Sequence, residues 1–522
     1  MRLADSIRDR EVDVLVIGSG AAGSVLAYHL AVAGQRVLVA ERGKRVRPEQ
    51  MPADEASRIA TLYKDGGAQM NHDADMFVLQ GSLVGGSTVL TNGVTLRLPE
   101  DVRASLAHDH AWELPADELA ASYARVEDVL NVAVMGQHLY SRASHKMAEG
   151  IRALGHAPGE FAKGMLRCIG CGYCNVGCHY GRKLDASQTW VPMAEARGAE
   201  ILAEVQVLEL EHRRGVVCAA RCRDLRSGKL FRVRAQRFVL AAGAIATPEL
   251  LLRSKLGGPR VGRGMSFNAG AIAFAEYPEE VDGHLGDQMC VHHFDARFAI
   301  EQVHNPELSF ALTLPGTFEQ HSARMRRYRR LASAGVLVPT QPVGRVYFGL
   351  GARLVPALFD HAELRFRMPA EDLVALRDGL KMLANIYFAS GATRVFVPSR
   401  MPLELQSARE VERIDAAIRR QSDLTNFGSS HPFGGAAIGE DSRVAPVDPE
   451  HRLRGVANLF VCDASVFPRA LRVNPMLTIM AVADRAARFL GVDVPVRIEE
   501  GPAYEARKRR ERARASSVGS PS

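Results

Sequence analysis

The segment 12–43 constrains the fold more than any other part of the chain. It reads as strand, glycine turn, helix and strand in the order VDVLVIGSGAAGSVLAYHLAVAGQRVLVAERG. Val14–Ile17 is an uninterrupted apolar run, which is typical of a parallel strand covered on both faces. The turn has the spacing G-x-G-x-x-G, formed by Gly18, Gly20 and Gly23. These glycines permit a tight turn, close approach of a pyrophosphate and close packing of helix on strand.

Two further features of this segment indicate a bound dinucleotide. Glu41 ends the second strand, eighteen residues after Gly23, where an acid can bind ribose hydroxyls. The helix that begins after Gly20 offers unpaired N–H groups and a positive dipole to phosphates. We therefore predict a Rossmann-like domain in an α/β protein. The motif alone does not separate FAD from NAD, although a start this close to the N-terminus is common in FAD enzymes.

Two later segments have small residues suited to a flat cofactor. The first, GSLVGGSTVLTNGVTLRLP, is rich in Gly, Ser, Thr and Asn. An ordinary loop is the alternative, because these residues favour loops anyway. The second, FVLAAGAIATPELLLRS, reads as an apolar strand, a turn around Gly243 and a helix with Pro248 in its first turn.

The block 431–490 is the last informative part of the chain. A strand over 458–462 ends in Asp463, Ala464 and Ser465. Pro475 opens an apolar helix that we expect to run to about Leu490, with Asn474 at or near its N-cap. The positive end of that helix could face developing charge on a bound ring.

Four cysteines have the spacing C-x2-C-x2-C-x3-C: Cys168, Cys171, Cys174 and Cys178. This is the bacterial ferredoxin run, except that His179 and not Pro follows the last cysteine. We predict an iron–sulfur cluster, either [3Fe-4S] or [4Fe-4S]. The alternatives are a zinc site, a disulfide pair or unligated loop thiols.

Composition narrows the class of protein further. The chain has 522 residues, a net charge of +7 and a pI near 9.0, and much of the excess charge lies in EARKRRERARASSVGSPS (residues 505–522), within the tail 496–522. We expect this basic tail to be disordered; an electrostatic dock for a membrane or an acidic partner is the alternative. Nucleic-acid binding has no support elsewhere in the sequence.

The start of the chain has no apolar signal region, and no run of 18 apolar residues occurs. We therefore expect no transmembrane segment and a cytoplasmic location, with membrane association through a partner left open. In that compartment the eight cysteines are expected to be thiols or ligands and not a disulfide framework.

These motifs, in this order, resemble the glucose–methanol–choline (GMC) flavoprotein oxidoreductases over nearly the whole chain. The resemblance implies an α/β (overall α+β) enzyme whose FAD-binding domain is interleaved with a substrate domain on an antiparallel sheet. We expect the FAD-binding domain over 1–270, with a Cys-rich insert at 160–185. The substrate domain is expected over 271–425, a return to the FAD-binding domain over 426–495, and the basic tail over 496–522.

The resemblance also implies a set of residues that hold FAD. They are Gly18, Gly20, Gly23, Glu41, Arg42, Gly85, Gly86, Thr88, Asn92, Val207, Gly243, Asp463, Ala464, Asn474, Pro475 and Met476. The GGSTVLTNG loop has one residue more than the common family form, so either Thr91 or Asn92 takes the asparagine role. Asn268 stands where many relatives have His, and we assign it no role.

Two branches of the family share particular motifs with this chain. HPFGG and RVNPMLTI are similar to cholesterol oxidases, in which a His and an Asn form the catalytic pair, here His431 and Asn474. The Cys-rich segment is similar to long-chain alcohol oxidases and to GMC dehydrogenases with an iron–sulfur cluster. A histidine suits removal of the hydroxyl proton, and an asparagine can hold the substrate oxygen. A structural role for His431 and simple helix capping by Asn474 are the alternatives.

The leading prediction is an FAD-dependent alcohol dehydrogenase that passes electrons through the cysteine-bound cluster to a protein or quinone acceptor. The alternatives are an O2-using oxidase with inert cysteines, a non-redox flavin lyase, and an electron-transferring subunit with a degenerate substrate site. The segment 268–426 is less informative. Within it, HSARMRRYRRLASAG (residues 321–335) predicts a basic helix. We interpret its charges as a solvated face, and a docking site for a partner is the alternative.

Overall fold

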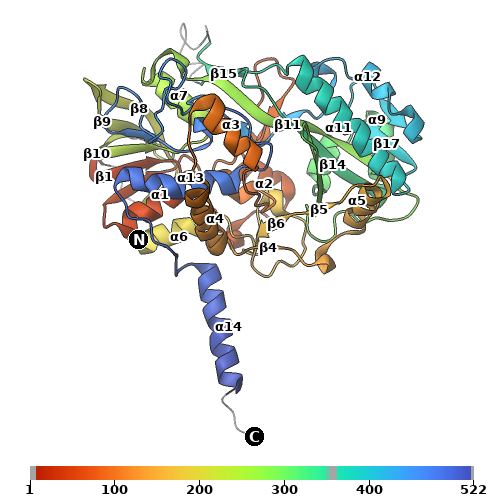
Figure 1. The fold of residues 1–522 in the computed structure, drawn as a ribbon, viewed down its shortest axis with the longest axis horizontal. Coiled ribbons are helices and arrows are strands. Elements are labelled where there is room, and N and C mark those ends of the chain that lie inside the picture. The colour runs from red at the N-terminus through yellow and green to blue at the C-terminus, as the bar shows by residue number, and fades with distance from the viewer. Residues whose placement is uncertain (1–7, 350, 352–360, 519–522) are drawn as a thin grey trace.

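The computed structural model describes residues 8–349, 351 and 361–518. Parts of the predicted FAD-binding domain, substrate domain and tail lie outside the described residues, namely residues 1–7, 350, 352–360 and 519–522. Figure 1 shows two sheets placed side by side, each flanked by helices. The mixed α/β class predicted from the sequence is confirmed.

The first sheet contains the predicted Rossmann-like motif. Its seven strands have the order β7-β2-β1-β10-β9-β8, and β21 pairs with β10. The pairs that join β7, β2, β1, β10 and β21 are parallel, and those that join β8, β9 and β10 are antiparallel. The bounds are β1 (Arg10–Ile17), β2 (Val37–Ala40), β7 (Glu200–Leu202), β8 (Val205–Arg213), β9 (Val216–Asp224), β10 (Leu230–Leu240) and β21 (Leu459–Val461).

Helices from both ends of the chain cover this sheet. The α1 helix packs against α13, which in turn packs against α4. The bounds are α1 (Ala21–Val32), α4 (Ala116–Leu130), α6 (Trp190–Ala196), α7 (Ala246–Arg253) and α13 (Met476–Ala486). A 3₁₀ turn extends α13 to Leu490, which is where we expected the helix to end.

The second sheet is built around β11 and has twelve strands. β11 pairs antiparallel with β14, β15, β17, β19 and β20, as predicted for the substrate domain. The bounds are β3 (Phe77–Val78), β5 (Gly159–Glu160), β11 (Arg263–Glu276), β12 (Val291–Phe294), β13 (Ala299–Gln302), β14 (Leu331–Pro339), β15 (Gly344–Tyr347), β16 (Glu363–Arg365), β17 (Arg394–Val397), β18 (Leu403–Leu405), β19 (Gly428–Ser429) and β20 (Pro432–Phe433).

The remaining elements lie around the second sheet or between the two sheets. Helix α11 packs on α5 and β14 and closes a second apolar core. The bounds are α2 (Glu55–Leu62), α3 (Glu100–His110), α5 (Arg142–Ala153), α8 (Glu307–Thr313), α9 (Phe318–Met325), α11 (Ala370–Ala389), α12 (Arg413–Ala417), and the strand pair β4 (Val132–Val134) and β6 (Ala162–Gly164).

The interleaving of the two sheets is deeper than the predicted boundaries allow. The boundary at residue 270 falls inside β11, which begins at Arg263. β3 and β5 come from the predicted FAD segment but pair in the second sheet, and so do β19 and β20 from the predicted return segment. These strands have only two residues each, too few to show the alternation that identifies a strand in a sequence.

Two predictions of local structure differ from the structure. The expected disordered tail contains the helix α14 (Pro502–Val518), which extends away from the body in Figure 1. Its Ala, Arg, Lys and Glu residues are strong helix formers, and Arg507 pairs with Asp128 of α4 at 2.9 Å. The basic helix expected over 321–335 ends at Met325, and β14 begins at Leu331. Among the described residues no helix is long and apolar enough to span a membrane.

Candidate active site

One large cavity, of about 700 Å³, is lined by residues from both sheets. It collects nearly all the residues predicted to bind FAD or to act on a substrate, although they come from distant parts of the chain. Those that line it are Gly18, Gly20, Glu41, Arg42, Gly86, Thr88, Asn92, Val207, Gly243, His431, Asp463, Ala464, Asn474, Pro475 and Met476. Only Gly23 and Gly85 of the predicted set are not among the lining residues.

The glycine-rich end of the cavity is shaped by backbone contacts. Gly18 has a φ of 101°, and a Cβ there would lie 2.3 Å from the Ala241 carbonyl oxygen. A Cβ on Gly86 would lie 2.8 Å from the Cα of Gly20. The two glycine-rich loops therefore touch, and neither contact tolerates a side chain.

The two predicted glycines outside the cavity support the same loops from behind. A Cβ on Gly23 would lie 1.9 Å from the Gly18 carbonyl oxygen, so helix α1 can approach β1 only without a side chain there. Gly85 has a φ of 94° and donates its N–H to the Ser19 hydroxyl at 3.0 Å. Their role is to hold the turns that face the cavity.

The first turn of α1 offers a place for phosphate. Gly20 is the N-cap of α1, and no side chain caps this end. A Cβ built on Gly20 has no protein atom nearer than 3.9 Å, so a side chain would enter the cavity instead of the fold. Free N–H groups at a helix N-terminus bind anions. The residues at this end therefore fit the pyrophosphate of FAD.

Glu41 lies at the expected end of β2, and its carboxylate is held by the glycine loop. Oε2 accepts from the Ser19 N–H at 3.0 Å and the Ser19 hydroxyl at 2.8 Å, while Oε1 accepts from the Gly43 N–H at 2.8 Å. Burial raises the pKa of Glu41, and these hydrogen bonds oppose the rise. The carboxylate thus fixes the loop while its edge lines the cavity.

Asp463 has a similar structural task at the other end of the cavity. Its Oδ2 accepts from the Gly243 N–H at 2.9 Å and the Thr247 hydroxyl at 2.5 Å, and Oδ1 accepts from the Ser465 N–H at 2.8 Å. Burial raises the pKa of Asp463 against the effect of these donors. One carboxylate therefore joins the turn after β10 to the turn after β21.

The GGSTVLTNG loop brings both candidates for the asparagine role to the cavity. Thr91 and Asn92 both line it. The Thr91 hydroxyl donates to the Thr88 carbonyl and accepts from the Gly93 N–H at 3.2 Å, so it is used within the loop. The buried Oδ1 of Asn92 has no hydrogen-bond partner in the described chain. Asn92 therefore has the free polar group.

His431 lies in the cavity with an unused ring nitrogen. Its Nδ1 is buried and has no partner among the described residues. Burial lowers the pKa of His431 to about 4, so the imidazole is neutral near pH 7 and can accept a proton. His431 therefore stays a candidate for the base, because it lines the cavity and has a ring nitrogen without a partner.

Asn474 meets a residue that the sequence analysis did not select. The helix α13 begins at Met476 with Pro475 as its N-cap and no side-chain cap, so Asn474 does not cap it. Its Nδ2 donates to Oε2 of Glu301 at 3.5 Å, and its buried Oδ1 has no partner among the described atoms. Burial raises the pKa of Glu301 to about 7 against the effect of this hydrogen bond.

Glu301 comes from β13 and also lines the cavity. The signal in the sequence was a single acid inside the apolar strand FAIEQV, because such a residue faces a core or a site. We missed it because its partner lies 173 positions away. His431, Asn474 and Glu301 together form a neutral base, an amide and a carboxyl group in one cavity.

Asn268 explains how two of these residues are held. Its Nδ2 donates to the Val473 carbonyl at 2.8 Å, and its Oδ1 accepts from the Arg472 N–H at 3.2 Å. Its backbone N–H donates to the His431 carbonyl at 3.2 Å. Asn268 thus joins the residues just before Asn474 to the segment of His431.

The four predicted ligand cysteines line one small pocket whose lining is distinct from that of the large cavity. Cys174 and Cys178 are buried, and all eight cysteines of the chain are free thiols. Burial raises the pKa of Cys168, Cys171 and Cys174. In the described part of the chain no three His, Cys, Asp or Glu side chains are placed to hold a metal ion, so neither the predicted iron–sulfur cluster nor the zinc alternative is supported by this arrangement.

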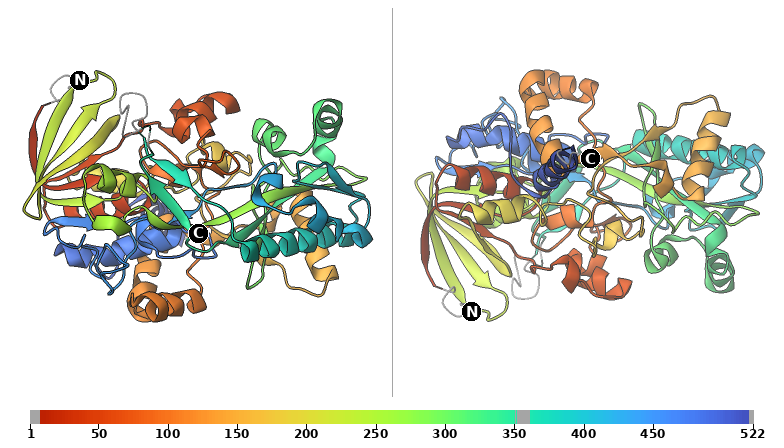
Figure 2. Two further views of the ribbon diagram at one scale, coloured as in Figure 1. Left: turned by 90° about the horizontal axis from the view of Figure 1, so that it is seen from above. Right: turned by 90° about the horizontal axis from the view of Figure 1, so that it is seen from below.

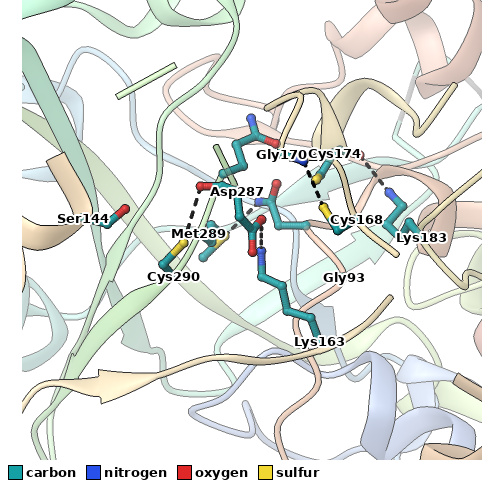
Figure 3. A network of polar contacts seen from close by, with 12 residues as sticks. Gly93, Ser144, Lys163, Cys168, Gly170, Cys174, Lys183, Asp287, Met289 and Cys290 are labelled. Carbon is teal, nitrogen blue, oxygen red and sulfur yellow. Dashed lines mark hydrogen bonds and ion pairs between the residues drawn. The ribbon is translucent and has the colours of Figure 1, made fainter. Parts of the chain in front are cut away.

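Two buried lysines flank this pocket (Figure 3). Lys163 pairs with Asp287 at 2.5 Å, and both side chains are fully buried. Lys183 donates to the carbonyls of Val89, Thr91 and Cys174 at 2.6, 2.6 and 2.7 Å. Its ammonium group therefore ties the cysteine loop to the loop that lines the large cavity.

A Rossmann-like sheet and an antiparallel sheet that share one cavity define a class of two-part flavin enzymes, and comparison with known proteins agrees. An FAD-binding-domain profile matches residues 13–54, and GMC oxidoreductase profiles match residues 59–292 and 356–483. The chain belongs to the GMC oxidoreductase family and is an FAD-dependent oxidoreductase. The predicted family and fold are confirmed.

Three curated relatives illustrate this membership. An uncharacterised GMC-type oxidoreductase of Mycobacterium tuberculosis is 30% identical, over 92% of this chain and 76% of the relative. Long-chain-alcohol oxidase FAO4A of Arabidopsis thaliana is 26% identical, over 92% and 68%. Cholesterol oxidase of Acinetobacter baumannii is 23% identical, over 93% and 95%.

A solved structure shows that the fold is shared beyond these sequences. Pyridoxine 4-oxidase from Mesorbium loti superposes with a TM-score of 0.67 at 19% identity, over 91% of this chain and 98% of that protein. At this identity the likeness concerns the fold alone.

Proposed function

We propose that the protein oxidises a hydrophobic primary or secondary alcohol at the His431 end of the cavity. The observation that carries the proposal is the convergence of His431, Asn474 and Glu301 on one cavity beside the dinucleotide fingerprint. FAD, when bound, supplies the acceptor for a hydride from the alcohol carbon. The names of the relatives, a long-chain-alcohol oxidase and a cholesterol oxidase, favour a hydroxyl substrate.

The roles of the three residues follow from their protonation and hydrogen bonds. His431 is neutral and has a free buried nitrogen, which suits it to take the hydroxyl proton. Asn474 has a free buried Oδ1 and an amide held by Glu301, which suits it to fix the substrate oxygen. Glu301 positions that amide.

A hydrophobic substrate is favoured by the walls of the cavity beyond this trio. They include apolar residues of β3, β11, β14 and α8, among them Phe77, Ile272, Leu312 and Leu337. A pocket of this kind gains affinity by burying apolar surface. The chain length or ring system of the alcohol stays open.

Anaerobic titration with alcohols tests the proposal. Addition of a long-chain alcohol to the FAD-loaded enzyme should bleach the flavin absorbance without O2 and release the matching aldehyde or ketone. A lyase or an electron-transferring subunit without a substrate site would leave the flavin oxidised. If no tested alcohol, short or long, bleaches the flavin absorbance, the proposed function is contradicted.

The identity of the electron acceptor gives two candidate functions. Two curated relatives are named oxidases, which favours O2 as the acceptor and inert cysteines. The second candidate is a dehydrogenase in which Cys168, Cys171, Cys174 and Cys178 bind a [3Fe-4S] or [4Fe-4S] cluster and a protein or quinone accepts the electrons. It is favoured by one observation, that all four cysteines line one pocket tied to the flavin-side loop by Lys183.

Iron and acid-labile sulfide assays on anaerobically purified protein separate the two candidates. The dehydrogenase should contain both, and Cys171→Ser should lose them together with dye reduction while alcohol still bleaches the flavin. Cys218→Ser, at an exposed thiol outside the pocket, is the control. Protein without iron that consumes O2 stoichiometrically with alcohol would establish the oxidase.

A further inference from the structure

Lys64 is a cation on the wall of the large cavity that has no counter-ion within the chain. Its side chain is half-buried and lines the cavity. Within the described ranges its Nζ makes no ion pair and no hydrogen bond. Burial lowers the pKa of Lys64 and the Glu249 carboxylate opposes this effect, but Glu249 itself pairs with Arg253 at 3.2 Å. Because an unpaired charge is costly to bury, this lysine indicates an anion that the chain does not supply.

Backbone contacts place Lys64 beside the two glycine-rich loops. The Lys64 N–H donates to the Gln80 carbonyl at 2.8 Å. The next residue, Gly81, lies against the second glycine-rich loop, because a Cβ built on it would be 2.9 Å from the carbonyl carbon of Gly86. Gly86 in turn lies against the Cα of Gly20. Successive backbone contacts thus join Lys64 to the uncapped first turn of α1, where the pyrophosphate of FAD is expected to bind.

A second cation shares this part of the wall. Arg42 lines the cavity and follows Glu41, whose carboxylate is bound by Ser19 of the fingerprint. Burial and, to a smaller extent, the Arg42 guanidinium lower the pKa of Lys64, so the two charges act on each other. Arg42 makes no ion pair with the residues that the structure describes. Two cations without a partner beside the fingerprint favour an anionic ligand at this end of the cavity.

The turn that carries Lys64 has an unusual backbone conformation. The three residues that follow it all have a positive φ, which is 52° at Asp65, 61° at Gly66 and 78° at Gly67. A residue with a side chain, such as Asp65, is uncommon in this region, and such strain concentrates at functional sites. Gly66 and Gly67 line the cavity as well. The turn therefore bends the chain along the cavity wall directly after Lys64.

The segment before this turn is fixed from outside by the cysteine loop. The Tyr63 hydroxyl donates to the Asn175 carbonyl at 2.5 Å, and Arg58 of α2 donates to the Gly177 carbonyl at 3.4 Å. In both views of Figure 2 the orange-red α2 lies at the edge of the molecule, between the parts built on the two sheets. The backbone of Lys64 is therefore held in place without any contact of its own ammonium group.

We propose that Lys64 is the counter-ion of the FAD diphosphate and binds it together with the first turn of α1. The helix end offers neutral N–H groups and a partial charge, whereas the lysine adds a full charge and a charge-assisted hydrogen bond. The inference concerns retention of the cofactor. It goes beyond the proposed function, because it holds for whichever substrate the enzyme takes.

The affinity of Lys64→Met for FAD tests the proposal. Methionine keeps the apolar stem of the side chain and removes only the charge. The Kd for FAD, measured from flavin fluorescence as the full-length holoenzyme is diluted, should rise about 10–100-fold, the range of a hydrogen bond to a charged group. Lys44→Met is the matched control, because Lys44 is exposed, pairs with Leu83 of the same loop and does not line the cavity. Its Kd should stay at the wild-type value.

Competition by ADP and by adenosine separates a diphosphate contact from other effects of the substitution. Each is added while the full-length protein, stripped of flavin, is reloaded with FAD. Lys64→Met should weaken competition by ADP as much as it weakens FAD binding and should leave competition by adenosine unchanged. A rise in KCl from about 0.05 to 0.5 M should weaken FAD binding more in the wild type than in Lys64→Met, because salt screens the contact that the variant lacks.

Three results would overturn this role of Lys64. They are equal Kd values for FAD in the wild type and Lys64→Met, an equal loss for ADP and adenosine, or a loss in Lys64→Arg as large as that in Lys64→Met. The arginine variant keeps the charge and should stay near the wild-type Kd, so it also shows whether the position tolerates substitution. No alcohol enters these measurements, and failure of the proposed alcohol oxidation would therefore leave the test of Lys64 unaffected.

Discussion

The two ends of the cavity are built in different ways. The dinucleotide end is made of backbone, with Gly18, Gly20 and Gly86 in contact with main-chain atoms. The proposed catalytic end is made of side chains from three distant segments, held by hydrogen bonds such as that between Asn474 and Glu301. A cofactor with an invariant phosphate can use local backbone geometry, whereas a particular substrate needs side chains brought together by the whole fold.

The strongest test of the backbone end is Gly20→Val. A valine side chain would enter the cavity where the pyrophosphate is expected to bind, so the purified protein should lack FAD and its visible absorbance. The flavin-to-protein ratio after gel filtration measures this. Gly20→Ala should show a smaller loss. Normal FAD content in Gly20→Val would mean that binding of the dinucleotide does not depend on close approach to the backbone at Gly20.

The strongest test of the side-chain end is His431→Ala. Loss of the base should lower kcat by about 10²–10⁴-fold while FAD content stays normal. His138→Ala, at an exposed position, is the control. Because burial lowers the pKa of His431 to about 4, the wild-type rate should fall only as the pH drops through that value. A variant that retains a third of wild-type kcat would exclude the role.

Glu301→Gln tests how much the catalytic end costs in stability. The pKa of Glu301 is raised to about 7 in the folded protein from an ordinary value of 4.5. The folded state therefore binds this proton more tightly than the unfolded state does. The contribution of this proton to the free energy of unfolding is lost as the pH rises from about 4.5 through 7. In Glu301→Gln the fall in unfolding free energy between pH 5 and pH 8 should shrink by about 2.5 kcal/mol.

Urea titrations at the two pH values measure this difference in free energy. Glu279→Gln, at an exposed acid that pairs with Lys146, serves as the control and should show no such gain. An equal fall in stability for the wild type and Glu301→Gln would show that Glu301 is not buried as a protonated acid.

Asn268→Ala should have the smallest effect and separates positioning from catalysis. It leaves the Arg472 N–H and the Val473 carbonyl without their partner, which should cost on the order of 1–3 kcal/mol of stability and about tenfold in kcat. Asn458→Ala removes comparable bonds to Val217 in the first sheet. It should lower stability similarly but leave kcat unchanged; equal kcat values in the two variants would contradict a positioning role.

The comparison of the two ends also explains what could be predicted from the sequence. The fingerprint residues, from Gly18 to Glu41, form a continuous motif whose chemistry is local, so their place in the fold could be predicted. Glu301 could not, because its meaning depends on Asn474, which reaches it only when β13 and the start of α13 meet. Family resemblance supplied His431 and Asn474, but not the contacts of Asn268.

Boundaries were the least predictable part of the fold. β19 and β20 have two residues each, and their pairing with β11 depends on register and not on periodicity. The helix α14 was missed for a different reason. A run of charged residues looks disordered when few apolar residues are present, although Ala, Arg and Glu favour helix.

The pairing of β21 with β10 has a consequence for how the protein is made. The sheet that carries the fingerprint near residue 18 is completed by residues 459–461, and the cavity is closed by residues 474–476. A nascent chain therefore holds the glycine loop without a finished place for the cofactor while more than 400 further residues are made. The place for the cofactor is completed only once residues 474–476 have been made, and a chain cut before residue 474 should remain colourless however much FAD the cell contains.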